Sequence, residues 1–172
     1  PAPDLGYFVS RGKSSPTARD SEHLDVHHLY WSGSLSCSRG RWRRGATFVH
    51  RGTAFLDVRV KYRGQTSCGK PKSGLKIAFN KGALFRGQER LNLLAGWQDR
   101  SLLREVLGWG LFRDIGHPHC EAKMAAVYDA SGALHGLYVG LEEPRSRYLR
   151  RQGLDAKARL WKCASSLLGG SA

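Results

Sequence analysis

The stretch AFLDVRVKYRGQTSCGKPKSGLKIAF, residues 54–79, decides how this chain is expected to fold. Apolar residues from Leu56 to Tyr62 alternate with Asp57, Arg59 and Lys61, which is the pattern of a half-buried strand. The alternation returns in the last six residues of the stretch, GLKIAF. A segment rich in Gly, Ser, Thr, Lys and Arg separates the two parts, so the stretch predicts two antiparallel strands joined by a basic loop.

Helix and hairpin signals follow this stretch. Apolar residues recur at helical spacing from Leu102 to Ile115, Asp99 is a suitable N-cap, and Gly116 ends the pattern. Residues 122–143 alternate on both sides of a turn, which predicts a β-hairpin. Strands followed by a helix and a hairpin are typical of the α+β class. We therefore expect an α+β fold, with an antiparallel sheet and one long helix.

Charge narrows the classes of partner. The chain of 172 residues has 28 Lys and Arg against 14 Asp and Glu, a formal net charge of +14. Such an imbalance favours an anionic partner, such as RNA, another polyanion or phosphate groups. No apolar run approaches the roughly 20 residues that a membrane-spanning helix needs, so we expect no membrane span.

The four cysteines do not follow a metal-binding or disulfide-dense pattern. Cys37, Cys68, Cys120 and Cys163 lie far apart and form no CxxC motif. Free thiols in a reducing compartment are the default expectation, with two disulfides in a secreted protein as the alternative. The sequence predicts no metal site, because the His-Pro-His-Cys run at 117–120 lacks partners of its own.

Two basic segments are candidates for binding anions. The loop after Arg63 combines Gly with hydroxyl groups and lysines, so its backbone amides could form a concavity for a phosphate. Composition alone favours a solvated hairpin there. In the run Ser-Arg-Gly-Arg-Trp-Arg-Arg, arginines flank an aromatic ring, which suits RNA and equally suits a charged sheet edge. The candidate nucleic-acid contacts are Arg39, Arg41, Trp42, Arg43 and Arg44.

Several motifs in order resemble the CotH (spore-coat protein H) family of atypical protein kinases. The stretch VRVKYRGQTSCGKPKSGLKIAF is similar to that family's strand, Arg-Gly-x-Ser-Ser loop and following lysine strand. LNLLAGWQDRSLLREVLGWGLFRDIG resembles its Leu-Asn-Leu-Leu-Ala block and helix. GLYVGLEEPRSRYLRR and RLWKCASS resemble its later strand, Glu, helix and Leu-Tyr-Lys strand. Motifs in the right order are more specific than any one alone.

The resemblance implies domains and roles. Residues 46–166 would be a domain like the N-terminal lobe of the kinase, preceded by a basic and aromatic extension (1–45) and followed by a flexible tail (167–172). ATP and Mg²⁺ are the implied cofactors. Lys76 would meet the phosphates, with Glu105 or Glu142 as its ion-pair partner. The implied nucleotide- or phosphate-binding residues are Arg63, Gly64, Thr66, Ser67, Lys70, Lys72 and Lys76.

The sequence also departs from the family. Thr66 replaces the first Ser of the loop, Arg145 stands where the family usually has Asp, and no acidic residue follows Asp155. The family's catalytic and Mg²⁺-holding aspartates lie in a second lobe, so no catalytic residue is assigned in this chain. Two functions stay open. One is a CotH-like lobe of a Ser/Thr protein kinase, inactive alone, which is either part of a longer kinase or completed by another chain. The other is a non-catalytic basic scaffold in a larger, RNA-containing assembly.

Overall fold

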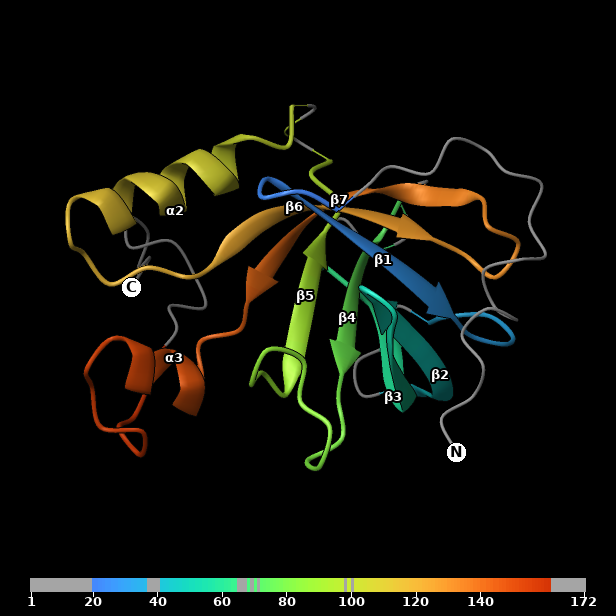
Figure 1. Ribbon diagram of the computed structural model, residues 1–172, viewed down its shortest axis with the longest axis horizontal. Helices are drawn as coiled ribbons and strands as arrows, with labels where there is room; N and C mark the ends of the chain where they lie inside the picture. Colours follow the sequence, from blue (N-terminus) through green and yellow to red (C-terminus); the bar gives the residue numbers. More distant parts are fainter. Residues whose placement is uncertain are drawn as a thin grey trace, which may run out of the picture.

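Strand pairing organises the computed structural model, which describes residues 20–36, 41–64, 68, 70, 72–97, 99 and 101–161. Seven strands of this part of the chain form a closed barrel in the order β1-β2-β3-β4-β5-β7-β6 (Figure 1). The strands are β1 (Leu24–Tyr30), β2 (Arg43–His50), β3 (Thr53–Arg63), β4 (Gly74–Ala78), β5 (Arg90–Leu94), β6 (Ala122–Tyr128) and β7 (Leu134–Glu142). The helices are α2 (Arg104–Asp114) and α3 (Ser146–Arg151).

The alternation in residues 54–79 fills the inside of the barrel. Val58 and Val60 of β3, and Leu75 and Ile77 of β4, are almost completely buried and belong to one apolar core. Phe48 of β2 lies among the core aromatic rings. Because successive side chains of a strand point to opposite faces, the residues between these positions point outward. The two strands and the hairpin predicted from the sequence are confirmed as β3, β4 and the β6–β7 pair.

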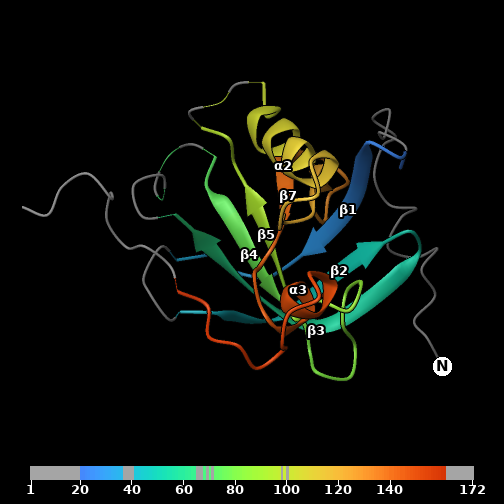
Figure 2. The same cartoon turned by 90° about the vertical axis from the view of Figure 1, so that its left-hand side faces the viewer.

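Parallel pairing of β1 with β6 closes the barrel. The register runs from Leu24 beside Met124 to His28 beside Tyr128, while the other edge of β1 pairs antiparallel with β2. Figure 2 shows the strands arranged around a common interior, with α2 at one rim. The segment 24–30, which the sequence assigned to an N-terminal extension, therefore contributes a strand to the barrel.

The predicted fold class is wrong. Instead of an α+β lobe built on an antiparallel sheet and one long helix, the described residues form a β-rich closed barrel with two short helices. The parallel β1–β6 pair joins segments about a hundred residues apart, and no local turn signals such a contact. The run LNLL, for which the sequence predicted no strand, forms most of β5 and adds further strand content.

Helix α2 is shorter and less packed than its apolar pattern predicted. It has 11 residues, none of them buried, and Leu107, Leu111 and Ile115 remain more than 60% exposed along one side. The predicted N-cap is also wrong, because Leu103 occupies that position. The carboxylate of Asp99 nevertheless accepts a hydrogen bond from the first helical amide, that of Arg104. A hollow of about 1050 Å³ separates α2 from the barrel rim.

Neither helix of the described residues is long and apolar enough to cross a membrane.

Charged and polar groups occupy the rim below α2. Asp25 accepts hydrogen bonds from Arg86. It also forms an ion pair with Lys123, in which Nζ lies 2.8 Å from Asp25 Oδ1. Burial tends to raise the pKa of Asp25, but these two cations outweigh it and hold the pKa at about 2. His27 is 1% exposed, and burial together with neighbouring His50 lowers its pKa to about 3. Its Nδ1 atom has no hydrogen-bond partner among the described residues, so a neutral imidazole is enclosed in the core.

If β1 is part of the core, replacing Leu29 with Ala should destabilise the protein. Leu29 is fully buried, so the cavity left behind should lower the free energy of unfolding by about 2–5 kcal/mol, measured by urea denaturation. Leu56→Ala is the matched control, because Leu56 is 50% exposed and should change stability by less than about 0.5 kcal/mol. Equal effects of the two substitutions would contradict the placement of β1 in the core.

The buried His27 should make stability fall in mild acid. Its folded pKa lies below the ordinary 6.5, so between pH 6.5 and about 3 the unfolded chain binds one more proton than the folded protein. Each unit of pH lost in this window should therefore lower the free energy of unfolding by up to about 1.4 kcal/mol through His27. Urea denaturation at several pH values should give a shallower slope for His27→Leu. Parallel slopes would contradict a neutral, buried His27.

Candidate functional site

The outward side chains of β3, β4 and β5 form a surface that we call the basic face. Strand register aligns these side chains in rows across the barrel wall. The rows are Arg63 beside Gly74; Lys61, Lys76, Asn92 and Leu141; and Arg59, Ala78 and Arg90. The same alternation that buries the valines of β3 therefore places its cations together on the outside.

Lys76 is at the centre of the basic face and forms an ion pair with Glu143. The Nζ atom of Lys76 donates a hydrogen bond of 2.6 Å to Glu143 Oε1, and both side chains are about four-fifths buried. Burial lowers the pKa of Lys76, an effect that Glu143 opposes. Burial raises the pKa of Glu143, but Lys76, Arg145 and Arg90 outweigh it and leave that pKa below its usual value. Glu143 is thus a carboxylate shared by three cations.

The two partners predicted for Lys76 lie elsewhere. Glu142 is 2% exposed and accepts hydrogen bonds from Arg147 and Arg151. Glu105 is exposed on α2 and accepts a hydrogen bond from the indole of Trp109. The predicted pairing of Lys76 with either residue is therefore wrong. Glu143 was missed because only the end of β7 decides which of two adjacent glutamates points inward.

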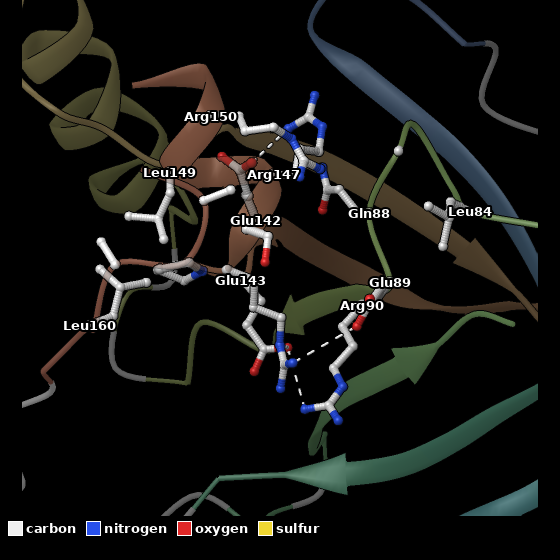
Figure 3. Close-up of a pocket in the computed structure, with 16 residues that line it drawn as sticks. Leu84, Gln88, Glu89, Arg90, Glu142, Glu143, Arg147, Leu149, Arg150 and Leu160 are labelled. Carbon is white, nitrogen blue, oxygen red and sulfur yellow. Dashed lines mark hydrogen bonds and ion pairs between the residues drawn. The ribbon is translucent and has the colours of Figure 1, made fainter. Parts of the chain in front are cut away.

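A pocket of about 300 Å³ separates these glutamates from the loop before β5 (Figure 3). Figure 3 shows Arg147 reaching Glu142 and Arg90 reaching Glu143 across it. Arg145 also contacts Glu143, at 3.2 Å, and Glu89, at 3.8 Å. Ion pairs therefore connect the end of the basic face near Arg90 to the segment after β7.

A larger cleft, of about 740 Å³, opens at the other end of the basic face beside Arg63. Arg63 is partly buried, and burial lowers the pKa of its guanidinium, against the effect of Glu143 and Glu105. Its Nη1 atom is buried and has no hydrogen-bond partner among the described residues. A buried guanidinium nitrogen without an acceptor is costly, so the hydrogen bonding of Arg63 is incomplete in this structure.

Some of the other predicted phosphate-binding residues share this cleft. Gly64 and Lys70 line it, and the Lys70 ammonium lies 5.8 Å from the centre of the Trp97 ring. Lys72 instead donates a hydrogen bond of 2.7 Å to the Leu137 carbonyl oxygen. Thr66 and Ser67 lie outside the described residues. The structure therefore brings Arg63, Gly64 and Lys70 together and directs Lys72 to β7.

Trp42 belongs to the predicted nucleic-acid segment. Its ring lies over the part of the basic face that contains Arg59 and Arg90. Lys61, Arg59 and Arg90 lie 4.9, 5.6 and 5.9 Å from the centre of its ring. Ala78 lies between Arg59 and Arg90 in the strand register, and its small side chain leaves room for an indole there. Nucleic-acid binding by this segment stays a prediction. Arg41, Arg43 and Arg44 are exposed, and Arg39 lies outside the described residues.

The acidic and histidine side chains that come closest to a metal-ligand arrangement are already engaged. Asp20, Asp25 and His50 place ligand atoms within 4.8 Å of one another. Asp25 is bound to Arg86 and Lys123, and Arg86 also donates to His50 Nε2. Two cationic side chains thus fill the position that a metal ion would need.

The cysteines differ from the expectation of free thiols throughout. Cys68 is disulfide-bonded. Cys120, in the His-Pro-His-Cys run, is a free and buried thiol, and burial with nearby Glu142 raises its pKa to about 11. A thiol with so high a pKa carries little thiolate at neutral pH and is a poor nucleophile or metal ligand.

Comparisons with known proteins agree with the motif resemblance. The family model described as CotH kinase protein matches residues 60–169, which include the basic face except Arg59. The inner spore coat protein H of Bacillus subtilis (strain 168) is 31% identical over 99 residues. This alignment covers 58% of the chain and 27% of that protein, so the chain corresponds to about a quarter of the relative's length.

The close packing of Arg63 against β4 gives a test of the site's geometry. A Cβ atom on Gly74 would lie 3.0 Å from Arg63 Cγ and 3.0 Å from the Leu93 carbonyl oxygen. Gly74→Ala should therefore lower the free energy of unfolding by about 1–3 kcal/mol in urea denaturation. A Cβ on Gly82 meets nothing within 4 Å, so Gly82→Ala should be nearly neutral. An equally neutral Gly74→Ala would contradict the described position of Arg63.

Proposed function

The chain belongs to the CotH kinase protein family, and on this premise we propose that its basic face binds the phosphate groups of ATP. The reaction we propose for the complete protein is transfer of the terminal phosphoryl group to a Ser or Thr hydroxyl of a protein. Such transfer depends mainly on positioning the phosphates and stabilising their charge. Side chains of the basic face are suited to the first of these tasks.

The observation that carries the proposal is Arg63, which lines the cleft and whose buried Nη1 atom has no hydrogen-bond partner among the described residues. Arginine presents a planar fork of donors that matches phosphate oxygens, and a contact with an ionised group is stronger than one between neutral groups. Lys76 follows two residues along the neighbouring strand from Gly74, on the same outward face. An extended triphosphate lying along these strands could therefore contact both cations.

Lys76 and Glu143 supply orientation. An ammonium on a flexible stem has many rotamers, and the 2.6 Å contact with Glu143 restricts them. The pair keeps the charge of Lys76 on the outward face and prevents its collapse onto other polar groups. Glu143 is a positioning residue in this proposal, because it acts through Lys76.

Trp97 is a candidate contact for the base of the nucleotide. Its side chain is 46% exposed and lines the same cleft as Arg63. Aromatic rings stack on bases with little dependence on their identity. The cleft thus offers both a cationic part and an aromatic part, as a nucleotide requires.

The described residues of the basic face do not fit Mg²⁺. This hard cation takes oxygen ligands, usually one or two carboxylates together with phosphate oxygens. Glu143 is engaged by Lys76, Arg90 and Arg145. We therefore assign no residue of this chain to the metal that the family resemblance implies, and derive no step from it.

Replacing Lys76 with Ala should weaken ATP binding. Loss of a charge-assisted contact to phosphate should raise the dissociation constant roughly 10- to 100-fold in isothermal titration calorimetry of the purified chain. Lys81→Ala is the matched control, because Lys81 is exposed in the turn after β4 and should leave the affinity unchanged. Unchanged binding by Lys76→Ala, with a normal unfolding curve, would remove Lys76 from the site.

A further inference from the structure

We propose that this chain binds the phosphate groups of its nucleotide without a divalent cation, because fixed side-chain cations of the basic face supply the neutralising charge. The inference rests on the proposed function and adds a property of the same site. It follows from the disagreement between Mg²⁺ and the donors that the described residues present. It concerns binding by this chain alone, and it assigns no step of phosphoryl transfer.

The only carboxylate at the centre of the described basic face already forms ion pairs with three cations, although its Oε2 atom accepts no hydrogen bond. Glu143 lies 2.6 Å from Lys76, 3.2 Å from Arg145 and 3.7 Å from Arg90. A magnesium ion at Glu143 would have to approach three fixed positive charges and displace at least one of them. Their repulsion of a divalent ion opposes its binding there.

The acidic side chains at the cleft are also engaged. Asp99 Oδ2 accepts from the Arg104 amide, and its Oδ1 accepts from the hydroxyl and amide of Ser101. Glu105 accepts from the Trp109 indole. These groups stabilise the turn before α2 and the helix itself. Among the described residues, each of these two cleft carboxylates therefore already accepts at least one hydrogen bond through one of its oxygens.

Cations outnumber acids on the same surface. The outward or adjacent positive side chains are Arg59, Lys61, Arg63, Lys76, Arg90 and Arg145. The described acids that contact them are Glu143 and, at the margin, Glu89, which lies 3.8 Å from Arg145. A site with surplus fixed positive charge attracts metal-free ATP more strongly than ATP with a bound metal ion, because the metal ion reduces the negative charge of the phosphates.

Trp42 holds part of this surplus in place. Its ring lies within 6 Å of Lys61, Arg59 and Arg90, which are three cations that would otherwise repel one another. Cation–π attraction offsets some of that repulsion without neutralising the charge. The indole therefore allows the three cations to lie close together and leaves their positive charge in place. A second carboxylate in the same position would neutralise part of that charge.

The test is calorimetric titration of the purified chain with ATP, once with excess Mg²⁺ and once with EDTA. We expect ATP to bind in EDTA at least as tightly as in Mg²⁺. Binding that requires Mg²⁺ would overturn this inference and leave the proposed function standing. Absence of binding under both conditions would overturn the proposed function together with the inference.

Three competitors in EDTA identify the chemical group that is recognised. Inorganic tripolyphosphate should displace ATP, whereas adenosine should not. If adenosine competed and tripolyphosphate did not, the phosphate assignment would be wrong. A single-stranded RNA oligonucleotide that bound more tightly than ATP would also overturn it, in favour of a nucleic-acid surface.

Substitutions at Arg63 and Arg145, with a control at Arg113, separate the cation-based mechanism from a merely structural role. Arg63→Gln should weaken binding in EDTA roughly tenfold or more, with Arg63→Lys partly restoring it and Arg113→Gln, an exposed change on α2, without effect. Arg145→Glu adds a carboxylate beside Glu143, so it should weaken binding in EDTA and make Mg²⁺ favourable. If Arg145→Glu binds ATP as the unaltered chain does under both conditions, the surplus charge is not the cause.

Discussion

Closure of the sheet by the parallel β1–β6 pair is the constraint on which the rest of the structure depends. A closed barrel has a single inside, which must be filled by apolar side chains from every strand. Alternate side chains of β3 and β4 point into that core. The side chains between them must therefore point outward. The cations of residues 59–76 are therefore aligned on the outer wall by the packing of the valines, leucines and isoleucine beneath them.

Electrostatics on that wall depend on one carboxylate. Glu143 contacts three cations, and no other described acid lies at the centre of the basic face. Its partly buried position strengthens each contact, because fewer water molecules screen the charges. The remaining cations are held by an aromatic ring or, at Arg63, by packing against Gly74. This arrangement leaves net positive charge beside a cleft.

Local patterns predicted much of the strand content, including the strand that contains Lys76. They predicted neither the fold class nor the ion-pair partner of Lys76. Alternation is a property of neighbouring residues, so β3, β4 and the β6–β7 hairpin could be predicted from the sequence. The partner of β1 lies about a hundred residues away, and the alternation of Leu91 and Leu93 with Arg90 and Asn92 is too short to distinguish β5 from a connection. The choice between Glu142 and Glu143 depends on where the pairing of β7 with β5 ends. Contacts between segments distant in the sequence determine the strand pairing and the orientation of these glutamates. The spacing of neighbouring residues does not predict such contacts.

The weak packing of α2 has a consequence for how the protein unfolds. A helix without a buried residue contributes little to the cooperative core, so its hydrogen bonds can open while the barrel stays intact. Its stability is therefore set locally, by the Asp99 carboxylate at its first amide and by the 11-residue length. The protein thus combines a cooperative barrel with a helix that can melt and reform as a separate unit, at an energetic cost far below that of global unfolding.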